Sequence, residues 1–454
     1  MTKKWLTMVV LAIPLWLGSL EAQDVTPTDA FAGWQAQAPR PELRPMFAVA
    51  RTGAPDGGPA LVVRHDAREG LDGCWTRNFP VNGGQWYAFR VLYRAQNVEV
   101  ERRSVVVKIH WRDDQGRPVP LDEPAVAGYL VGHTPMAETE FPPTGPATAS
   151  GWREVSGVYR APSRAHQAIV ALHLQWAPHG SVFWSLPSWQ PTDPPLPRKA
   201  RLAAVHFMPR NGKTPMDNCR MFVPWIEKAA QQKADLVVLG EVLTYVGLGK
   251  SLCECAEPVP GPATEFFGKL AAKHDLYIVA GLLERDGHLV YNVAVLLGPD
   301  GRLVGKYRKV CLPRSEIEAG LAPGKDYPVF DTRFGKVGMM VCYDGFFPEV
   351  ARELSQRGAE VIAWPVWGCN PLLARARACE NHVYIVSSTY SPPEANWMFT
   401  GVVDHAGEIV ARASQPGEVA LVEVDLNQRF RWVSLGDFKA YIPRHRPIQL
   451  PEPK

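Results

Sequence analysis

The sequence predicts two domains in series: an all-β sandwich, then an α/β domain with helices on both sides of its sheet. Three features lead to this expectation. Residues 23–190 carry short β-type runs punctuated by Gly and Pro, residues 191–199 are rich in proline, and residues 200–427 alternate apolar strands with helices. At 454 residues the chain is also too long for one ordinary core.

The first domain shows the alternation of half-buried strands. Residues 104–111 place Val105, Val107, Ile109 and Trp111 on one face, and Val106, Lys108 and His110 on the other. Successive side chains of a strand point to opposite faces, so we expect the first set in the core and the second in water.

The end of this domain, residues 151–162, 168–176 and 180–184, resembles jelly-roll modules of the galactose-binding or carbohydrate-binding type. The resemblance leaves a glycan open as a partner of the domain. The tryptophans in this part either stack on sugar rings or, as is more usual in a sandwich, fill the core: Trp152, Trp176, Trp184 and Trp189.

The linker at 191–199 contains four prolines, which cannot join the interior of a sheet and favour an extended chain. After it, the apolar runs predict buried strands at 202–207, 236–239, 276–283, 291–297, 302–307, 336–341, 361–366 and 383–388. Helices are expected at 216–232, 264–273, 348–357 and 372–381. Strands this apolar are covered on both faces, which predicts flanking helices.

The two ends of the chain differ from the domains. Residues 1–22 read as a secretory signal, with Lys3 and Lys4 before an apolar run and small residues after it, so we expect an exported protein. Residues 428–454 have little periodicity and several prolines, and we expect an extended arm over the domain or over a neighbouring subunit.

Composition excludes some classes of function. Lys and Arg total 49 and Asp and Glu total 46, a balance that does not indicate a nucleic acid as partner. The eight cysteines are scattered, and most are expected to be free. No cluster of residues with metal-ligand spacing is evident, so neither a metal nor a cofactor is predicted.

Cys342 lies where an apolar strand turns into a helix that starts near Pro348. Such a turn exposes a nucleophile at the edge of a sheet, and the following N–H, that of Tyr343, can face an oxyanion. A single cysteine in this position is more often a core residue. Glu241, at the end of another strand, and Lys309, after a hairpin, add a carboxylate and an ammonium to the set.

The segments around these residues resemble the nitrilase superfamily of carbon–nitrogen hydrolases. The resemblance runs over residues 202–426 and rests on Lys-Tyr-Arg-Lys-x-x-Leu-Pro at 306–313 and Cys-Tyr-Asp-x-x-Phe-Pro-Glu at 342–349. It implies an αββα sandwich, a homodimer or higher homo-oligomer, and a catalytic triad of Glu241, Lys309 and Cys342.

The resemblance also implies roles. Glu241 would take the thiol proton of Cys342, and Lys309 would stabilise the oxyanion. A second glutamate that positions the substrate is common in the family. Glu316 and Glu318 are both candidates, and the spacing from Lys309 favours Glu316. Trp367 falls in a loop where the family contacts substrate.

The dipeptide Tyr343-Asp344 looks like the amidase and carbamoylase branch rather than the nitrilase branch. The predicted function is therefore hydrolysis of a small amide or N-carbamoyl (ureido) compound through a cysteine thioester, with release of ammonia or an amine. Two alternatives stay open: a polysaccharide- or surface-binding protein with an inactive hydrolase scaffold, and an N-acyltransferase.

Overall fold

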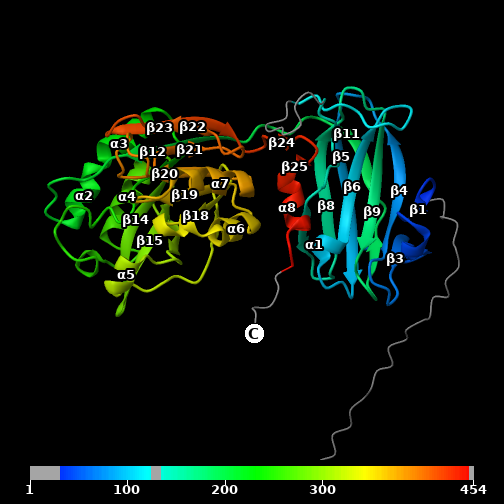
Figure 1. Cartoon of the computed structure of the whole chain (residues 1–454), viewed down its shortest axis with the longest axis horizontal. Coiled ribbons are helices and arrows are strands. Elements are labelled where there is room, and N and C mark those ends of the chain that lie inside the picture. Colours follow the sequence, from blue (N-terminus) through cyan, green and yellow to red (C-terminus); the bar gives the residue numbers. More distant parts are fainter. Residues whose placement is uncertain (1–30, 124–133, 449–454) are drawn as a thin grey trace, which may run out of the picture.

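The computed structural model describes residues 31–123 and 134–448 (Figure 1). The secretory signal expected over residues 1–22 lies outside these residues. Within them, no helix combines the length and the apolar character that a membrane span requires.

The N-terminal region is all-β and consists of two sheets packed face to face. One sheet has the order β1-β4-β9-β6 and the other β2-β3-β10-β5-β8-β7, with β11 also paired to β5. The strands are β1 Gln35–Gln37, β2 Met46–Ala50, β3 Ala60–Arg64, β4 Asp72–Pro80, β5 Trp86–Gln96, β6 Val105–Arg112, β7 Thr144–Ala147, β8 Arg153–Arg160, β9 Gln167–Gln175, β10 Ser181–Trp184 and β11 Ser188–Thr192. The short helices are η2 Pro41–Leu43 and α1 Glu101–Ser104.

The core between these sheets is rich in aromatic side chains, and it includes Trp184 and Trp189. Trp152 is also buried, but it lies outside this core beneath the guanidinium of Arg94. Trp176 is 46% exposed beneath the guanidinium of Arg103. The core interpretation is therefore confirmed for Trp184 and Trp189.

The prediction of a wet outer face on β6 was wrong. Val106 is buried and both Lys108 and His110 are half-buried. The reason is a chain segment that runs beside the strand, because Glu140 forms a bridge to Ile109 and Thr139 hydrogen-bonds His110.

The α/β region has four layers, helices–sheet–sheet–helices, which confirms the expected αββα sandwich. The first sheet has the order β16-β15-β14-β13-β12-β23 and the second β17-β18-β19-β20-β21-β22. Its strands are β12 Lys199–His206, β13 Leu236–Val238, β14 Tyr277–Asp286, β15 Leu289–Leu297, β16 Leu303–Arg308, β17 Val329–Asp331, β18 Lys336–Met339, β19 Val361–Pro365, β20 Tyr384–Ser388, β21 Gly401–Val403, β22 Ile409–Arg412 and β23 Glu418–Asp425. Only residues 193–198 separate this region from β11 without regular structure.

Helices cover the outer face of each sheet. On the first sheet lie α2 Pro215–Met221, α3 Val223–Gln231 and α4 Pro262–His274; on the second lie α6 Pro348–Gln356 and α7 Pro371–Asn381. Three short helices, η3 Cys253–Cys255, α5 Arg314–Glu318 and η4 Cys342–Phe346, belong to loops.

The single helix expected at 216–232 is two helices, α2 and α3, which meet at Phe222. Pro224 lies in the first turn of α3, where a backbone N–H is not needed for a helical hydrogen bond. In the interior of one continuous helix the same proline would remove a hydrogen bond, so α2 ends before it. Phe222 is fully buried at this junction.

The extended arm expected at 428–454 was wrong for the part that the structure describes. This segment forms a two-stranded ribbon, β24 Arg431–Trp432 and β25 Gly436–Asp437, and then the helix α8 Phe438–His445. In Figure 1 the red α8 lies between the two domains. Tyr441 packs on Phe141 of the β region with ring centroids 4.5 Å apart. Such aromatic contacts stabilise the helix, and they could not be predicted from the composition of the segment.

Candidate active site

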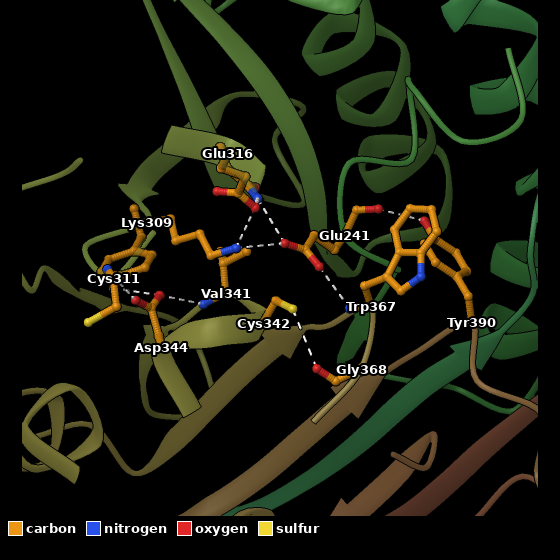
Figure 2. A network of polar contacts seen from close by, with 12 residues as sticks. Glu241, Lys309, Cys311, Glu316, Val341, Cys342, Asp344, Trp367, Gly368 and Tyr390 are labelled. Carbon is orange, nitrogen blue, oxygen red and sulfur yellow. Dashed lines mark hydrogen bonds and ion pairs between the residues drawn. The ribbon is translucent and has the colours of Figure 1, made fainter. Parts of the chain in front are cut away.

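The ends of three strands bring the predicted triad together between the two sheets of the αββα sandwich (Figure 2). Glu241 follows β13, Lys309 follows β16 and Cys342 follows β18. Glu241 and Lys309 are 3% and 0% exposed, so their charges interact with little screening by water.

The Glu241 carboxylate is held on both oxygens. Its Oε1 accepts hydrogen bonds from Lys309 Nζ at 3.1 Å and from Asn292 Nδ2 at 2.8 Å. Its Oε2 accepts one from the backbone N–H of Trp367 at 2.7 Å. The carboxylate is therefore fixed in orientation, as a proton acceptor for a nearby thiol must be.

Close backbone packing places Glu241 this deep in the molecule. A Cβ on Gly281 of β14 would lie 2.6 Å from the Cα of Glu241, so only glycine permits the approach. The hydroxyl of Tyr390 donates to the backbone carbonyl of Glu241 at 2.7 Å, and a Cβ on Gly240 would collide with the Tyr390 ring.

Lys309 is shared by two carboxylates. Its Nζ donates to Glu316 Oε1 at 2.6 Å as well as to Glu241, and Glu316 lies on α5. Burial lowers the pKa of Lys309, but Glu241, Cys342 and Glu316 together outweigh burial and the pKa is raised. Lys309 therefore stays cationic, as an oxyanion partner has to be.

Glu316 keeps one free acceptor. Its Oε1 also accepts from Asn292 Nδ2 at 3.0 Å, whereas its buried Oε2 has no partner among the described residues. Burial and the nearby Glu241 carboxylate raise the pKa of Glu316 against the opposing effect of Lys309. Glu318, the alternative candidate, points to the surface and pairs with Arg314, so it does not enter the site.

Cys342 has the backbone of a strained turn. Its φ is +40°, a conformation that non-glycine residues seldom adopt, and it opens the helix η4. The thiol donates to the carbonyl of Gly368 at 3.6 Å. Burial and the Glu241 carboxylate raise the pKa of this thiol, with Lys309 opposing them, so the resting group is a thiol that needs a base.

Asp344 braces the turn that carries Cys342. It is fully buried and accepts from the Val341 N–H at 2.9 Å, the Cys311 N–H at 2.8 Å and the Tyr307 hydroxyl at 2.8 Å. These bonds tie the nucleophile turn to the segment that carries Lys309. Burial raises the pKa of Asp344 to about 6 although the two N–H donors lower it.

Several aromatic side chains lie near the triad. Tyr343 packs on Phe347 at 5.2 Å, Trp367 packs edge-on against Tyr390 at 5.3 Å, and Trp397 lies on Gly368. The backbone N–H of Trp367 donates to Glu241, and its side chain is 40% exposed. The first N–H groups of a helix have no intrahelical partner, which leaves that of Tyr343 free for an oxyanion.

Sequence reasoning missed Asn292, and it used Asp344 only as a marker of the branch. Asn292 lies in the apolar strand β15, and its side-chain amide interrupts an otherwise apolar run of residues between Tyr291 and Val293. A buried amide inside an apolar strand needs partners, so this residue was detectable as an anomaly, although not as a site residue.

Among residues 31–123 and 134–448 no group of His, Cys, Asp and Glu is arranged to hold a metal ion. The eight cysteines are free, as expected for most of them.

Residues 203–432 match the model of the carbon–nitrogen hydrolase family. The chain is 40% identical over 213 residues to a nitrilase of Pyrococcus abyssi (strain GE5 / Orsay), over 44% of this chain and 80% of that protein. It is 31% identical over 271 residues to the omega-amidase NIT2-B of Xenopus laevis, over 55% of this chain and 94% of that protein. A crystal structure of Saccharomyces cerevisiae Nit3, a member of branch 10 of the nitrilase superfamily, aligns with a TM-score of 0.45 and 28% identity, over 50% of this chain and 90% of that chain.

The chain therefore belongs to the carbon–nitrogen hydrolase family, within the nitrilase superfamily. Its family relatives support a hydrolase of carbon–nitrogen bonds. The all-β region lies outside the matched residues.

Proposed function

We propose that this protein hydrolyses small linear amides through a thioester on Cys342. The observation that carries the proposal is the shared ammonium of Lys309, which lies between Glu241 and Glu316 beside the thiol. Nucleophilic acyl transfer needs a nucleophile, a base that activates it and a cation that stabilises the oxyanion. The Cys342 thiol, the fixed Glu241 carboxylate and the Lys309 ammonium can supply them.

In the first half-reaction, Glu241 takes the proton of Cys342 and the thiolate attacks the amide carbon. The oxyanion that forms receives hydrogen bonds from Lys309 and from the Tyr343 N–H. The C–N bond then breaks as Glu241 returns the proton to the leaving nitrogen, which departs as ammonia from a primary amide or as an amine from a secondary one.

In the second half-reaction, Glu241 takes a proton from water, and the resulting hydroxide attacks the thioester. The C–S bond breaks, the proton returns to the Cys342 sulfur and a carboxylic acid leaves. One amide and one water thus give one acid and one ammonia or amine, and the enzyme returns to its starting state.

Open acceptors favour an amide or ureido substrate over a nitrile. The buried atoms Glu316 Oε2 and Asn292 Oδ1 have no partner among the described residues. An ionised Glu316 can accept an N–H of an amide, whereas a nitrile has none to offer. Leaving a buried acceptor unpaired costs about 1–3 kcal/mol, which favours the amide.

The test measures ammonia release from primary amides, N-carbamoyl compounds and nitriles of matched carbon chains. We expect release from the amides or N-carbamoyl compounds and its loss by about 10⁴-fold or more in Cys342→Ala. Cys379→Ala, a half-buried cysteine of α7 outside the site, is the matched control and should retain activity. Equal release by wild type and Cys342→Ala would refute the proposal.

The thioester itself has a direct test. Intact mass spectrometry of the wild-type protein, quenched with acid during turnover of an amide, should show one added acyl group that is absent from Cys342→Ala, which lacks the nucleophile. Transfer of that acyl group to added amines in preference to water would favour the acyltransferase alternative.

We also propose export of the protein and its assembly into a homodimer or larger homo-oligomer. The basic and apolar pattern of residues 1–22 supports the first, and membership of the nitrilase superfamily supports the second. Sequencing of the N-terminus of the exported protein tests export, and an uncleaved N-terminus would overturn it. Sedimentation at micromolar concentration tests the assembly, and a strict monomer would overturn it.

A further inference from the structure

A cavity of about 750 Å³ lies where the β region, the end of α6 and the C-terminal segment meet, away from the triad. Its walls include Tyr93 and Arg102 of the β region, Gln356 of α6, and Lys439 and Arg444 of α8. This volume falls in the range of roughly 300–1,000 Å³ that is typical of small-molecule sites, and interfaces between domains are preferred places for them.

The charge of the walls is unbalanced. Five basic and three acidic side chains line the cavity. The three carboxylates already have partners: Glu101 pairs with Arg153 at 3.0 Å, Glu140 with Arg429 at 3.0 Å, and Asp437 with Arg429 at 3.8 Å.

The remaining cations have no such partner. Arg102 and Arg444 donate only to backbone carbonyls, and Lys439 makes neither a hydrogen bond nor an ion pair, in each case within residues 31–123 and 134–448. Burial lowers the pKa of Lys439 and of Arg444, and for Lys439 it outweighs the opposing effect of the Glu360 and Asp437 carboxylates. A contact that only joined two domains would be more stable with these cations neutralised.

We propose that this cavity is a binding site for an organic anion with two or more carboxylate, sulfate or phosphate groups, held by Lys439, Arg444 and Arg102. The buried ring of Phe141, over which the Arg444 guanidinium lies at 5.4 Å, forms an apolar wall for the carbon skeleton of the ligand. A second cavity of about 790 Å³ shares Pro143, Tyr159 and Arg429 with the first. The two cavities therefore lie next to each other along the β region. The site is independent of the catalytic proposal.

The test is isothermal titration of the full chain with sodium sulfate, with citrate and with oligogalacturonate, using NaCl at matched ionic strength as reference and maltohexaose as the neutral sugar. We expect saturable binding of at least one anion, absent for maltohexaose. Binding of citrate without oligogalacturonate identifies a small carboxylate as the ligand, and binding of oligogalacturonate identifies an acidic sugar chain. Binding of sulfate alone would contradict an organic anion as the ligand.

Lys439→Gln is the decisive variant, because the Lys439 amine makes no hydrogen bond or ion pair to the residues that the structure describes, so its loss should disturb the fold little. It should weaken the affinity about tenfold or more, as expected for loss of a charge-assisted hydrogen bond. Arg64→Gln removes the same charge from an exposed position on β3 and should stay within about twofold of wild type. Cys342→Ala should bind like wild type. Absence of binding by every anion, or equal affinities of Lys439→Gln and Arg64→Gln, would overturn the site.

Discussion

Two buried ion clusters of this molecule look alike but are built differently. At the triad, one cation serves two carboxylates, and Glu316 Oε2 is left without a partner among the described residues. At the contact between the β region and the C-terminal segment, Glu140 has one guanidinium for each oxygen, Arg431 at 2.9 Å and Arg429 at 3.0 Å.

The two clusters differ in whether every acceptor oxygen has a partner. We call the one at the triad the reactive cluster and the one around Glu140 the structural cluster. In the structural cluster each acceptor is satisfied, so it can hold two segments together without a ligand. In the reactive cluster one acceptor stays open and two carboxylates share a single ammonium, an arrangement more typical of a functional site than of a structural contact. Changes at the two clusters should therefore have different consequences, as the following four experiments test.

The largest effect is expected for Glu241→Gln. The amide side chain retains the size of the carboxylate but cannot take a proton, so kcat should fall toward the upper end of the roughly 10²–10⁴-fold range for general acid–base groups. The melting temperature should also fall, because the amide nitrogen cannot accept the hydrogen bonds that one carboxylate oxygen receives. A variant with near wild-type kcat in steady-state assays would show that the reactive cluster does not contain the base.

Arg431→Met tests the structural cluster. It leaves Glu140 with Arg429 alone and should destabilise the contact by about 3 kcal/mol, the lower end of the range for a broken buried pair. Limited proteolysis at residues 193–198 should become faster while the kcat for a small amide is unchanged. Arg90→Met, in an exposed pair with Glu154, is the control and should cost under about 1 kcal/mol. Equal proteolysis of both variants would contradict the comparison.

Glu316→Gln compares the two glutamates of α5. The substitution replaces the open oxygen of Glu316 with an NH₂ group, which cannot accept a hydrogen bond from the substrate. The substrate is then misplaced, so kcat/KM for amides should fall by about 10²-fold. Glu318→Gln, on the surface, should stay within about twofold. If both variants behave alike in initial-rate assays, Glu316 does not position the substrate.

The smallest effect concerns acidification of the C-terminal contact. Burial lowers the pKa of His382 to about 4 and that of His405 well below its usual value, and both rings pack on residues of the segment. Between about pH 6.5 and pH 4 the unfolded chain binds more protons than the folded one, so stability is complete above the unfolded pKa and falls as the pH is lowered.

We therefore expect the thermal midpoint to drop from pH 7 to pH 5, equivalent to about 1–2 kcal/mol. His382→Gln retains an acceptor for the Trp432 N–H, which lies 3.2 Å from His382 Nε2, and should flatten the pH dependence. Identical pH slopes for wild type and His382→Gln would rule out this source of acid sensitivity.

Particular residues show how far the sequence reaches. The strand ends at Glu241 and Cys342 were predictable because apolar runs with turn residues report local structure, and the triad is supported by its flanking motifs. The spacing from Lys309 favoured Glu316 but could not exclude Glu318, because the choice depends on how α5 packs against β15. The helix α8 was not predictable, since its aromatic side chains become ordered only against Phe141, which precedes β7 far away in the chain.

Local patterns of a few residues were enough to predict the order of two domains, the αββα class through its family motifs, and the three residues of the candidate triad. The folded structure was needed to show that Glu316 rather than Glu318 joins Lys309, that Asn292 and Asp344 brace the site, and that the C-terminal segment lines a cationic cavity. Each of these results from residues far apart in the chain, whose meeting is decided by the packing of whole sheets and helices rather than by neighbours in sequence.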